Sequence, residues 1–329
     1  MTRLFPFKTA AVALLALAAS GCSVFGLFGD APADGASQNP SVDTGSPDVP
    51  AQTAERVPGQ CYAAFLEENY QKAFELCSGS REPEALYNTA WMYGHGRGAS
   101  QNLAKSRVLM ERAALGGHAG AMYETGRMYD SGLGGRQSYR DAILWYQKAA
   151  EKREIRAMNA LASMYYCGDG TEQDFGRSLL WSLRAADAGS GEGMYNVGRL
   201  LEEKKILPGQ VAEPDADLWY KRAAEKRYPE AEFLLARRDY QKTRSAASVR
   251  RLKQAAADGS PGAAMYLGTL AEKALAGVKK SRSKAAAYCW YSLAAAGGSS
   301  EAGEKMKHLA SGFSASQLKS VEDNCHIGD

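Results

Sequence analysis

The six cysteines are the residues of this chain best suited to chemistry, and their spacing narrows what that chemistry can be. Thiols bind zinc, act as nucleophiles, form disulfides or accept lipid. No two of them form a C-x-x-C pair, so the sequence does not predict a zinc ribbon. We therefore consider a lipid attachment site, disulfide partners and single thiols among Cys22, Cys61, Cys77, Cys167, Cys289 and Cys325.

Catalytic motifs are otherwise weak or absent from the sequence. Two S-x-x-K matches, Ser281–Lys284 and Ser316–Lys319, resemble a motif of penicillin-interactive enzymes, but the S-D-N and K-T-G partners of that motif do not occur. No phosphate-binding loop, zinc-protease motif or nucleophile elbow occurs either. A multi-histidine metal centre is not expected from four scattered histidines, His95, His118, His308 and His326. The sequence therefore predicts no catalytic residue, no metal and no cofactor.

The N-terminus has the pattern of a bacterial export signal. Arg3 and Lys8 precede an apolar run at residues 10–19, and no acidic residue stands before Asp30. A run of this length fits the core of a signal peptide and is too short to cross a bilayer. We expect residues 1–21 to be removed.

The signal is followed by Ala19–Ser23, which resembles a lipobox in which Cys22 receives lipid and becomes the mature N-terminus. The match is imperfect, because leucine is more usual at the position of Ala19. Two fatty acyl groups or more hold a protein stably on a membrane, and by resemblance Ser23 favours the outer membrane. Cleavage at an ordinary site, which gives a soluble periplasmic protein, and an uncleaved anchor are the alternatives.

Residues 22–59 are expected to form the lipidated cysteine and a disordered linker. The stretch from Asp30 to Pro58 holds five of the eleven prolines, is rich in small and polar residues, and has no aromatic residue. Such a composition cannot bury enough apolar area to offset its ordering entropy. As a flexible coil it spans roughly 30 Å, which suits a tether between a membrane and a folded body.

The net charge of the chain is small. Forty basic and 37 acidic residues give +3, and removal of the signal peptide takes away two basic residues and leaves +1. Nucleic-acid binding usually needs a concentrated basic surface, so we do not expect a nucleic-acid partner. The hydrophobic content of 45% excludes a chain that is disordered throughout.

The rest of the sequence is built on a repeat of about 36 residues. Ala-Ala pairs begin at Ala113, Ala149, Ala185, Ala223, Ala255 and Ala294, and four of the five tryptophans stand four residues before such a pair. In the third unit we expect a first helix over about 156–166, a turn at Gly168–Gly170, and a second helix over about 175–188. One such pair cannot bury its apolar face alone, so the units must stack.

This pattern resembles the Sel1-like repeat, a relative of the tetratricopeptide repeat. The clearest unit, Ala121–Glu154, has the Gly-x-Gly turn and the sequence Trp-Tyr-x-Lys-Ala-Ala. The resemblance implies an all-α fold, a right-handed α-solenoid of about six helix-turn-helix repeats over residues 84–300. We expect a capping helical hairpin at 60–83 and closing helices at 301–329. Units four to six depart from the pattern, because each lacks the glycine turn or the tryptophan.

Four cysteines are placed to close the two ends of this array. Cys61 and Cys77 lie at equal distances from the expected turn of the N-terminal hairpin, so antiparallel helices would bring them side by side. Cys289 and Cys325 are candidates for a similar disulfide in the C-terminal cap, and an exported protein can keep such bonds. Buried free thiols are the alternative. Cys167 would then be a leftover structural thiol.

A partner-binding groove is the best candidate for a functional surface. In tetratricopeptide-like arrays the first helices line a concave groove, and aromatic residues and arginine are typical of binding hot spots. That register places Tyr87, Tyr123, Asn159 and Tyr195 at one position, and Trp91, Arg127, Ser163 and Arg199 one turn later. The aromatic and basic members are the candidate binding residues. Packing of the tyrosines between units, with the arginines exposed, is the alternative.

These observations favour a non-enzymatic scaffold for protein–protein interaction. The resemblance implies an outer-membrane lipoprotein whose groove faces periplasmic or outer-membrane proteins, in polysaccharide export, signalling regulation or envelope assembly. A peptidoglycan-linked structural protein is possible as well. The alternative is a weak hydrolase acting on β-lactams or peptidoglycan, as in cysteine-rich secreted relatives, although those relatives carry a cysteine pair in nearly every unit.

Overall fold

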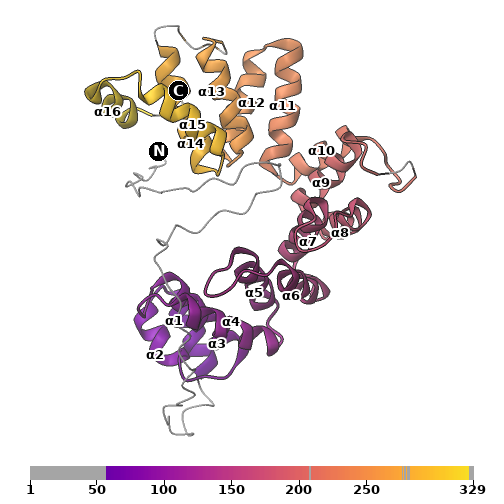
Figure 1. Ribbon diagram of the computed structural model, residues 1–329, viewed down its shortest axis with the longest axis vertical. Helices are drawn as coiled ribbons and strands as arrows, with labels where there is room; N and C mark the ends of the chain where they lie inside the picture. The colour runs from indigo at the N-terminus through magenta and orange to yellow at the C-terminus, as the bar shows by residue number, and fades with distance from the viewer. Residues whose placement is uncertain (1–56, 207–208, 276, 278, 280–281, 326–329) are drawn as a thin grey trace. The chain divides into compact units, whose positions relative to one another are not determined.

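A computed structural model describes residues 57–206, 209–275, 277, 279 and 282–325 (Figure 1). The predicted all-α fold is confirmed, because sixteen helices make up the regular structure of these residues and no strand occurs among them. The signal peptide, Cys22 and most of the predicted linker lie outside the described residues. The chain forms two compact units that divide between Leu235 and Ala236, and each is considered by itself.

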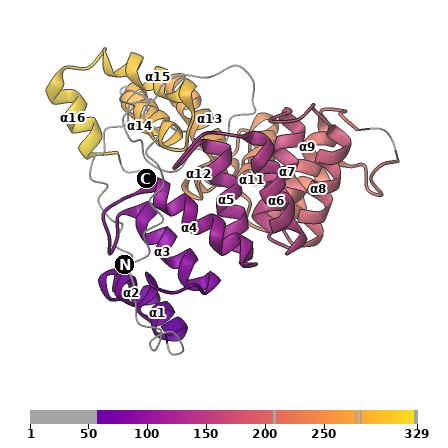
Figure 2. The ribbon, with the colours of Figure 1, turned by 60° about the horizontal axis from the view of Figure 1, so that its bottom comes forward.

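The N-terminal unit holds the first ten helices and the start of the eleventh. They are α1 Val57–Leu66, α2 Tyr70–Cys77, α3 Pro83–His95, α4 Leu103–Leu115, α5 Ala119–Ser131, α6 Tyr139–Glu151, α7 Ile155–Cys167, α8 Phe175–Asp187, α9 Gly191–Glu202, α10 Ala216–Glu225 and α11 Pro229–Thr243. From α3 to α10 the helices form consecutive antiparallel pairs, and each pair packs on the next through α4–α5, α6–α7 and α8–α9 (Figures 1 and 2). The hairpin of α1 and α2 packs on α3.

The C-terminal unit continues the same pattern. Its helices are the rest of α11, then α12 Ala246–Ala257, α13 Pro261–Glu272, α14 Ser283–Ala296, α15 Ser300–Ala310 and α16 Ala315–Asp323. Helix α13 forms a pair with α14, α12 packs on α13, and α15 packs on α14.

Residues at the helix ends explain where the second helices of the first three pairs begin and where the first helices stop. The second helices begin after Asn102, Ser138 and Asp174, whose side chains each accept a hydrogen bond from a backbone N–H of the first turn. The first helices end at the first glycine of each Gly-x-Gly turn, which adopts the left-handed conformation, for example with φ +75° at Gly132.

The second glycine of the turn has a different role. A Cβ on Gly134 would lie 2.2 Å from the carbonyl oxygen of Leu103, at the start of the preceding second helix. A Cβ on Gly98 would meet the carbonyl oxygen of Tyr70 in the same way. The turn can therefore pack directly on the previous pair only because it has no side chain at this point.

Alanine and glycine let the helices of a pair approach closely. The first alanine of every Ala-Ala pair is fully buried. A second small residue on each first helix faces the second helix, and its identity alternates along the chain. In the second, fourth and sixth units it is Gly126, Gly198 or Gly268, opposite Tyr146, Tyr220 or Tyr291. We call these the glycine–tyrosine units.

In the first, third and fifth units the same position is alanine, and we call these the alanine units. Ala90, Ala162 and Ala236 are all buried. At the tyrosine position these units have Met110, Ser182 and Leu252, which are also buried. Ser106 and Ser178, one turn earlier, donate hydrogen bonds to the carbonyl oxygens of Ala90 and Ala162 at 2.7 and 2.8 Å.

Candidate binding surface

The residues predicted to line a groove lie on the first helices of the N-terminal unit. Helices α3, α5, α7 and α9 carry Tyr87, Trp91, Tyr123, Arg127, Asn159, Ser163, Tyr195 and Arg199, which we call the first-helix face. All eight are buried or half-buried. Most of them contact the helix pair before or after their own, as the following contacts show.

Trp91 joins the N-terminal hairpin to the first pair. Its ring stacks on Tyr70 at 5.5 Å and on His95 at 4.0 Å between ring centres, and it meets Phe65 edge-on at 5.1 Å. These contacts leave little of the indole for a partner. Trp91 therefore serves mainly as a packing residue of the cap.

Tyr87 joins the first pair to the second. Its ring stacks on His118 with ring centres 4.4 Å apart, and burial raises the pKa of its hydroxyl. His118 caps α5, because its Nδ1 accepts the backbone N–H of Ala121 at 2.9 Å. With Nδ1 as acceptor, the proton sits on Nε2, which donates to Glu84 at 3.0 Å. The two ring nitrogens are thus both engaged.

Tyr123 joins the second pair to the third through an arginine. The Arg156 guanidinium lies 4.4 Å from the centre of the Tyr123 ring, a cation–π contact. Arg156 also pairs with Glu154 at 2.9 Å and with Glu124 at 3.5 Å, and Glu124 pairs with Arg127 at 2.8 Å. Acids and bases therefore alternate here and neutralise one another, and Arg127 remains about a quarter exposed.

Asn159 takes the same position in the third pair and makes hydrogen bonds in place of ring contacts. Its Nδ2 donates to Ser190 Oγ at 3.0 Å and to Glu192 Oε2 at 2.9 Å. Ser190 in turn caps α9 by accepting the N–H of Gly193. Burial raises the pKa of Glu192, and the hydrogen bond from Asn159 partly opposes that shift.

Tyr195 and Arg199 form the last part of this face. Tyr195 lies between two further tyrosines, with ring centres 5.6 Å from Tyr220 and 5.2 Å from Tyr228. The Arg199 guanidinium lies 3.9 Å from the centre of the Tyr166 ring. Unlike Arg127, Arg199 makes no ion pair with any described residue, and its Nε is buried without a hydrogen-bond partner among them.

The four positions equivalent to Tyr87 therefore hold successive pairs together, as the packing alternative expected. Their partners, His118, Arg156, Ser190 and Tyr228, were not singled out from the sequence. They stand 31 to 33 residues after the residues that they contact, at the start of the next first helix. That recurring offset is the signal that could have found them. Whether Arg127 and Arg199 also contact a partner remains a prediction.

Both predicted disulfides are present. Cys61 pairs with Cys77 and Cys289 with Cys325, with Cα atoms 5.3 and 5.4 Å apart. The prediction for Cys167 is wrong, because it too is disulfide-bonded, and its partner is not among the other described cysteines. Cys22, the predicted lipid site, lies outside the described residues.

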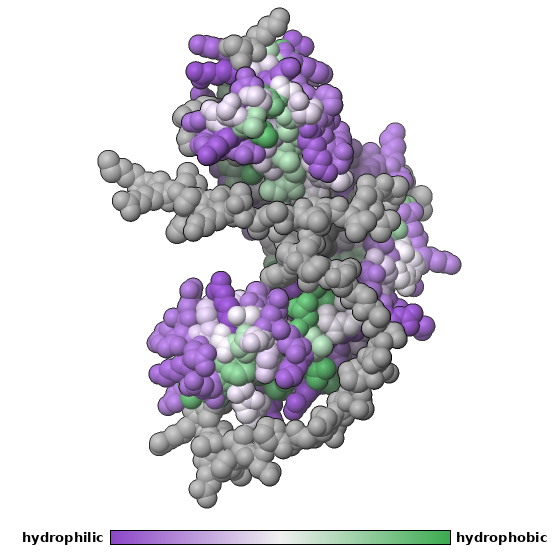
Figure 3. All heavy atoms as spheres, turned by 60° about the vertical axis from the view of Figure 1, so that its left-hand side comes forward, coloured by the Kyte–Doolittle hydropathy of each residue, from purple (hydrophilic) through white to green (hydrophobic). Residues whose placement is uncertain are grey.

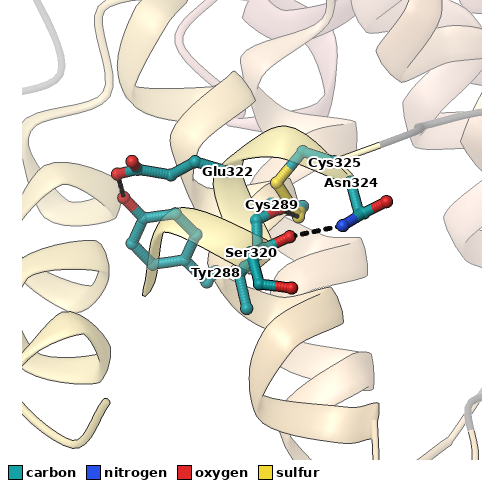
Figure 4. Close-up of a disulfide and its surroundings, with 7 residues drawn as sticks. Tyr288, Cys289, Ser320, Glu322, Asn324 and Cys325 are labelled. Atoms are coloured by element: carbon teal, nitrogen blue, oxygen red, sulfur yellow. Dashed lines mark hydrogen bonds between the residues drawn. A yellow bond between two sulfur atoms is a disulfide. The ribbon is translucent and has the colours of Figure 1, made fainter. Parts of the chain in front are cut away.

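The two disulfides lie in different surroundings. Cys61 and Cys77 are almost completely buried, in a cluster with Ala73 and Met92. By contrast, α16 has no buried residue. It is attached to α14 by the Cys289–Cys325 bond and by a hydrogen bond of 2.8 Å from the Tyr288 hydroxyl to Glu322, as Figure 4 shows.

Other features of the sequence carry no site in the described part of the chain. Ser316 and Lys319 lie on α16, where the Ser316 hydroxyl is 3.1 Å from that of Ser314, and Ser281 is not described. No cluster of three or more possible metal ligands occurs among the residues in view. None of the described helices is long and apolar enough to cross a membrane.

Solved structures of other proteins align with this chain. A crystal structure of a Sel1 repeat protein from Oxalobacter formigenes aligns with a TM-score of 0.60 at 21% identity, over 73% of this chain and 99% of that chain. A protective antigen of uropathogenic Escherichia coli with an SLR fold aligns at 19% identity over 80% of this chain and 82% of that chain, with a TM-score of 0.31. An immunity protein from Pseudomonas aeruginosa aligns at 19% identity over 66% and 83%, with a TM-score of 0.45.

The sequence itself matches one family model. No curated protein matches the chain. The model of the Sel1 repeat matches residues 83–118, 119–153, 155–190 and 261–299, which are the first three and the sixth of the predicted units. The unmatched stretch between them holds the four helices α9 to α12. The chain therefore contains Sel1 repeats.

Proposed function

We propose that this chain is a non-enzymatic scaffold that binds proteins in the bacterial envelope, and that it is anchored to the outer membrane through lipid on Cys22. The observation that carries the proposal is that α3, α5, α7 and α9 each place residues of the first-helix face at equivalent positions. Stacked helix pairs offer an extended surface whose residues can change without loss of the fold. The partner is a periplasmic or outer-membrane protein, or peptidoglycan.

Two further observations support a location outside the cytoplasm. Disulfides persist in oxidising compartments, and this chain has two whose partners are both described, Cys61–Cys77 and Cys289–Cys325. The N-terminal sequence has the pattern of a lipoprotein signal. The linker length then allows the helical body to meet partners away from the membrane surface.

Arg127 and Arg199 provide the test of the binding face. We expect the double variant Arg127→Gln/Arg199→Gln to lose a partner that the wild-type protein retains after crosslinking and pull-down from the native envelope. Glutamine is neutral, so unlike an acidic residue it is not repelled by Glu124 and Glu192. The thermal unfolding temperature should therefore change little. Lys226→Gln/Lys319→Gln removes two exposed charges elsewhere and is the control. Full binding by the folded Arg127/Arg199 variant would exclude this face.

Mass spectrometry of the mature protein tests the anchor. Lipidation predicts that the chain begins at Cys22 with the mass of the attached acyl groups, and an unmodified Cys22 or a different first residue would refute it. A lipidated cysteine has a thioether sulfur, so lipidation of Cys22 and a disulfide between Cys22 and any other cysteine exclude each other. Recording the spectrum without reduction therefore decides between the two.

The absence of enzyme activity can be tested directly. The wild-type protein should not hydrolyse nitrocefin above the rate of a Ser281→Ala/Ser316→Ala variant. It should likewise not release fragments from purified peptidoglycan sacculi. Hydrolysis that these substitutions abolish would replace the scaffold by a hydrolase, whereas simple retention of the protein on sacculi would identify peptidoglycan as a partner.

A further inference from the structure

A second surface of the first three units combines exposed aliphatic and basic side chains. Among the coloured residues of Figure 3 hydrophilic ones predominate, and hydrophobic ones appear in smaller patches. Three of the exposed large apolar side chains share one repeat position on the second helices: Val108 on α4, Leu144 on α6 and Leu180 on α8 are 57%, 52% and 46% exposed. Single exposed apolar residues need no explanation, but recurrence at a spacing of 36 residues does.

A cation follows each of these aliphatic residues after one helical turn. The basic residues are Arg112, Lys148 and Arg184, four residues further along the same helix face. Lys148 and Arg184 lie over the rings of Trp145 and Trp181, at 4.2 and 4.6 Å from the ring centres. None of the three cations makes an ion pair with a described residue, so their hydrogen-bond donors face solvent.

The preceding turn is basic as well. Lys105 and Arg177 stand three residues before Val108 and Leu180, and Arg140 stands four residues before Leu144. All three are exposed, and only Arg177 is paired with a described acid, Asp174 at 3.3 Å. The aliphatic row therefore has a basic row on one side and mostly basic residues on the other, where Asp141 takes the position equivalent to Lys105 and Arg177. Acidic residues of α6 and α8, such as Glu151 and Asp187, lie one turn beyond the second basic row.

We propose that this surface, formed by Val108, Leu144 and Leu180 with Arg112, Lys148 and Arg184 and here called the second-helix face, docks an extended acidic segment of a partner protein. Apolar side chains of the segment would cover the aliphatic row, and its carboxylates would pair with the cations on either side. The inference rests on the proposed scaffold function, but it uses residues that the first-helix face does not contain.

The charge and the position of the aromatic rings decide the kind of partner. An excess of unpaired cations around the aliphatic row is complementary to an acidic chain, and such complementarity favours specificity and fast association. An anionic membrane would also attract the cations, but insertion normally uses projecting aromatic rings. Trp145 and Trp181 are half-buried, and each has a cation over its ring. A peptide segment is therefore the occupant that this face fits.

The test uses a fluorescein-labelled peptide of four Glu-Glu-Leu repeats and the full-length protein. Fluorescence anisotropy should show binding with a dissociation constant below 1 mM, weakened at high salt. The triple variants Val108→Ser/Leu144→Ser/Leu180→Ser and Arg112→Gln/Lys148→Gln/Arg184→Gln should each bind roughly tenfold more weakly, since both kinds of contact contribute. The control Lys72→Gln/Lys226→Gln/Lys319→Gln removes as many exposed charges elsewhere and should bind within about twofold of wild type.

Each other outcome overturns the inference. If the wild-type protein does not bind the peptide, the proposed docking surface is wrong. If the serine variant binds as well as wild type, the peptide is held by non-specific charge attraction and not by the aliphatic row. Vesicles containing phosphatidylglycerol, if they bind through the same residues while the peptide does not, identify a membrane surface instead. The Arg127→Gln/Arg199→Gln variant should bind the peptide normally. If that variant alone loses the peptide, the second-helix face fails and the first-helix face remains.

Discussion

The glycine–tyrosine units and the alanine units differ in the sizes of the two residues that stand where their first and second helices approach each other. In both kinds of unit the first and second helices must approach closely at one point. In the second unit, a tyrosine ring fills that space, and a Cβ on Gly126 would lie 2.6 Å from the ring of Tyr146. In the third unit the equivalent residues are Ala162 and the much smaller Ser182, both buried, and Ser178 donates a hydrogen bond to the carbonyl oxygen of Ala162. The size of one residue thus follows from the size of the other.

The hydroxyl group of each of these tyrosines also has a hydrogen-bond partner. In every glycine–tyrosine unit an acid stands four residues after the glycine, and it accepts a hydrogen bond from the tyrosine hydroxyl. The distances are 3.3 Å for Tyr146 to Asp130, and 2.6 Å for Tyr220 to Glu202 and for Tyr291 to Glu272. A buried hydroxyl without such a partner would be unfavourable. Glycine, tyrosine and acid therefore act as one set.

The substitution Gly126→Ala, which adds a single methyl group, is expected to have the largest effect on stability. Alanine is about 1 kcal/mol better than glycine inside an exposed helix, so Gly126→Ala would stabilise the protein if propensity decided. The new Cβ overlaps the Tyr146 ring, and overpacking of a buried site costs roughly 1 to 3 kcal/mol. After subtraction of the gain in helix propensity, we expect a net loss of up to about 2 kcal/mol in the free energy of unfolding, measured by urea denaturation.

Gly303 provides the matched control. It lies in α15, and the nearest atom to a Cβ there, that of Ala295, is 4.0 Å away. Gly303→Ala should therefore stabilise the protein by about 0.5 to 1 kcal/mol. The comparison fails if both substitutions change stability in the same direction.

The second prediction converts one kind of unit into the other. Gly126→Ala combined with Tyr146→Met gives the second unit the residues that the first has as Ala90 and Met110. Removal of the ring leaves room for the methyl group, so the double variant should be more stable than the sum of the single changes predicts. We expect a coupling of about 1 to 2 kcal/mol in a double-mutant cycle. Additive changes would show that ring and glycine do not share this space.

Much of this fold could be predicted from the sequence, because successive units carry the same residue types at the same positions. Six Ala-Ala pairs fixed the second helices, and the glycine turns fixed where the first helices end. The pairing of Cys61 with Cys77 followed from the geometry of one hairpin. The sequence predicts the second glycine of each turn only as part of that turn, whereas its closer constraint is the backbone of the preceding pair, for example Leu103 against Gly134.

The candidate site was harder to predict for a physical reason. Tyrosine and arginine are enriched both at binding surfaces and between packed helices, so residue type alone could not separate the two roles of Tyr87 or Tyr123. Their packing partners, such as His118 and Arg156, come from the next unit. No hairpin in the sequence places a second cysteine beside Cys167, so the sequence predicts it as a leftover thiol.

The third prediction concerns alkaline pH in the C-terminal unit. Burial and the hydrogen bond to Glu272 raise the pKa of Tyr291 to about 12, and burial and the bond to Glu322 raise that of Tyr288 to about 12. In the unfolded chain both ionise near pH 10. Their contribution to stability is thus complete below pH 10 and is lost as the pH rises towards 12.

The two full shifts would lower the free energy of unfolding by about 4 kcal/mol between pH 9 and pH 11.5. Solvent screening at these hydroxyl groups, which are only partly surrounded by protein, reduces the effect, so we expect a fall of roughly 1.5 kcal/mol. Urea denaturation at intervals of half a pH unit measures the slope. The variant Tyr288→Phe/Tyr291→Phe has no hydroxyl to titrate at these positions and should show a flatter profile. An equal slope in the variant would assign the alkaline loss to other groups.

The smallest expected effect separates the hydroxyl from the ring. Tyr220→Phe keeps the ring against Gly198 but removes the 2.6 Å hydrogen bond to Glu202, and a bond to a carboxylate contributes about 1.5 kcal/mol. Tyr146→Phe removes a longer bond of 3.3 Å to Asp130 and should cost about half as much. Urea denaturation of both variants gives the order. If the order is reversed, or if either loss approaches that of Gly126→Ala, the hydroxyl rather than the fit of ring to glycine distinguishes the two kinds of unit.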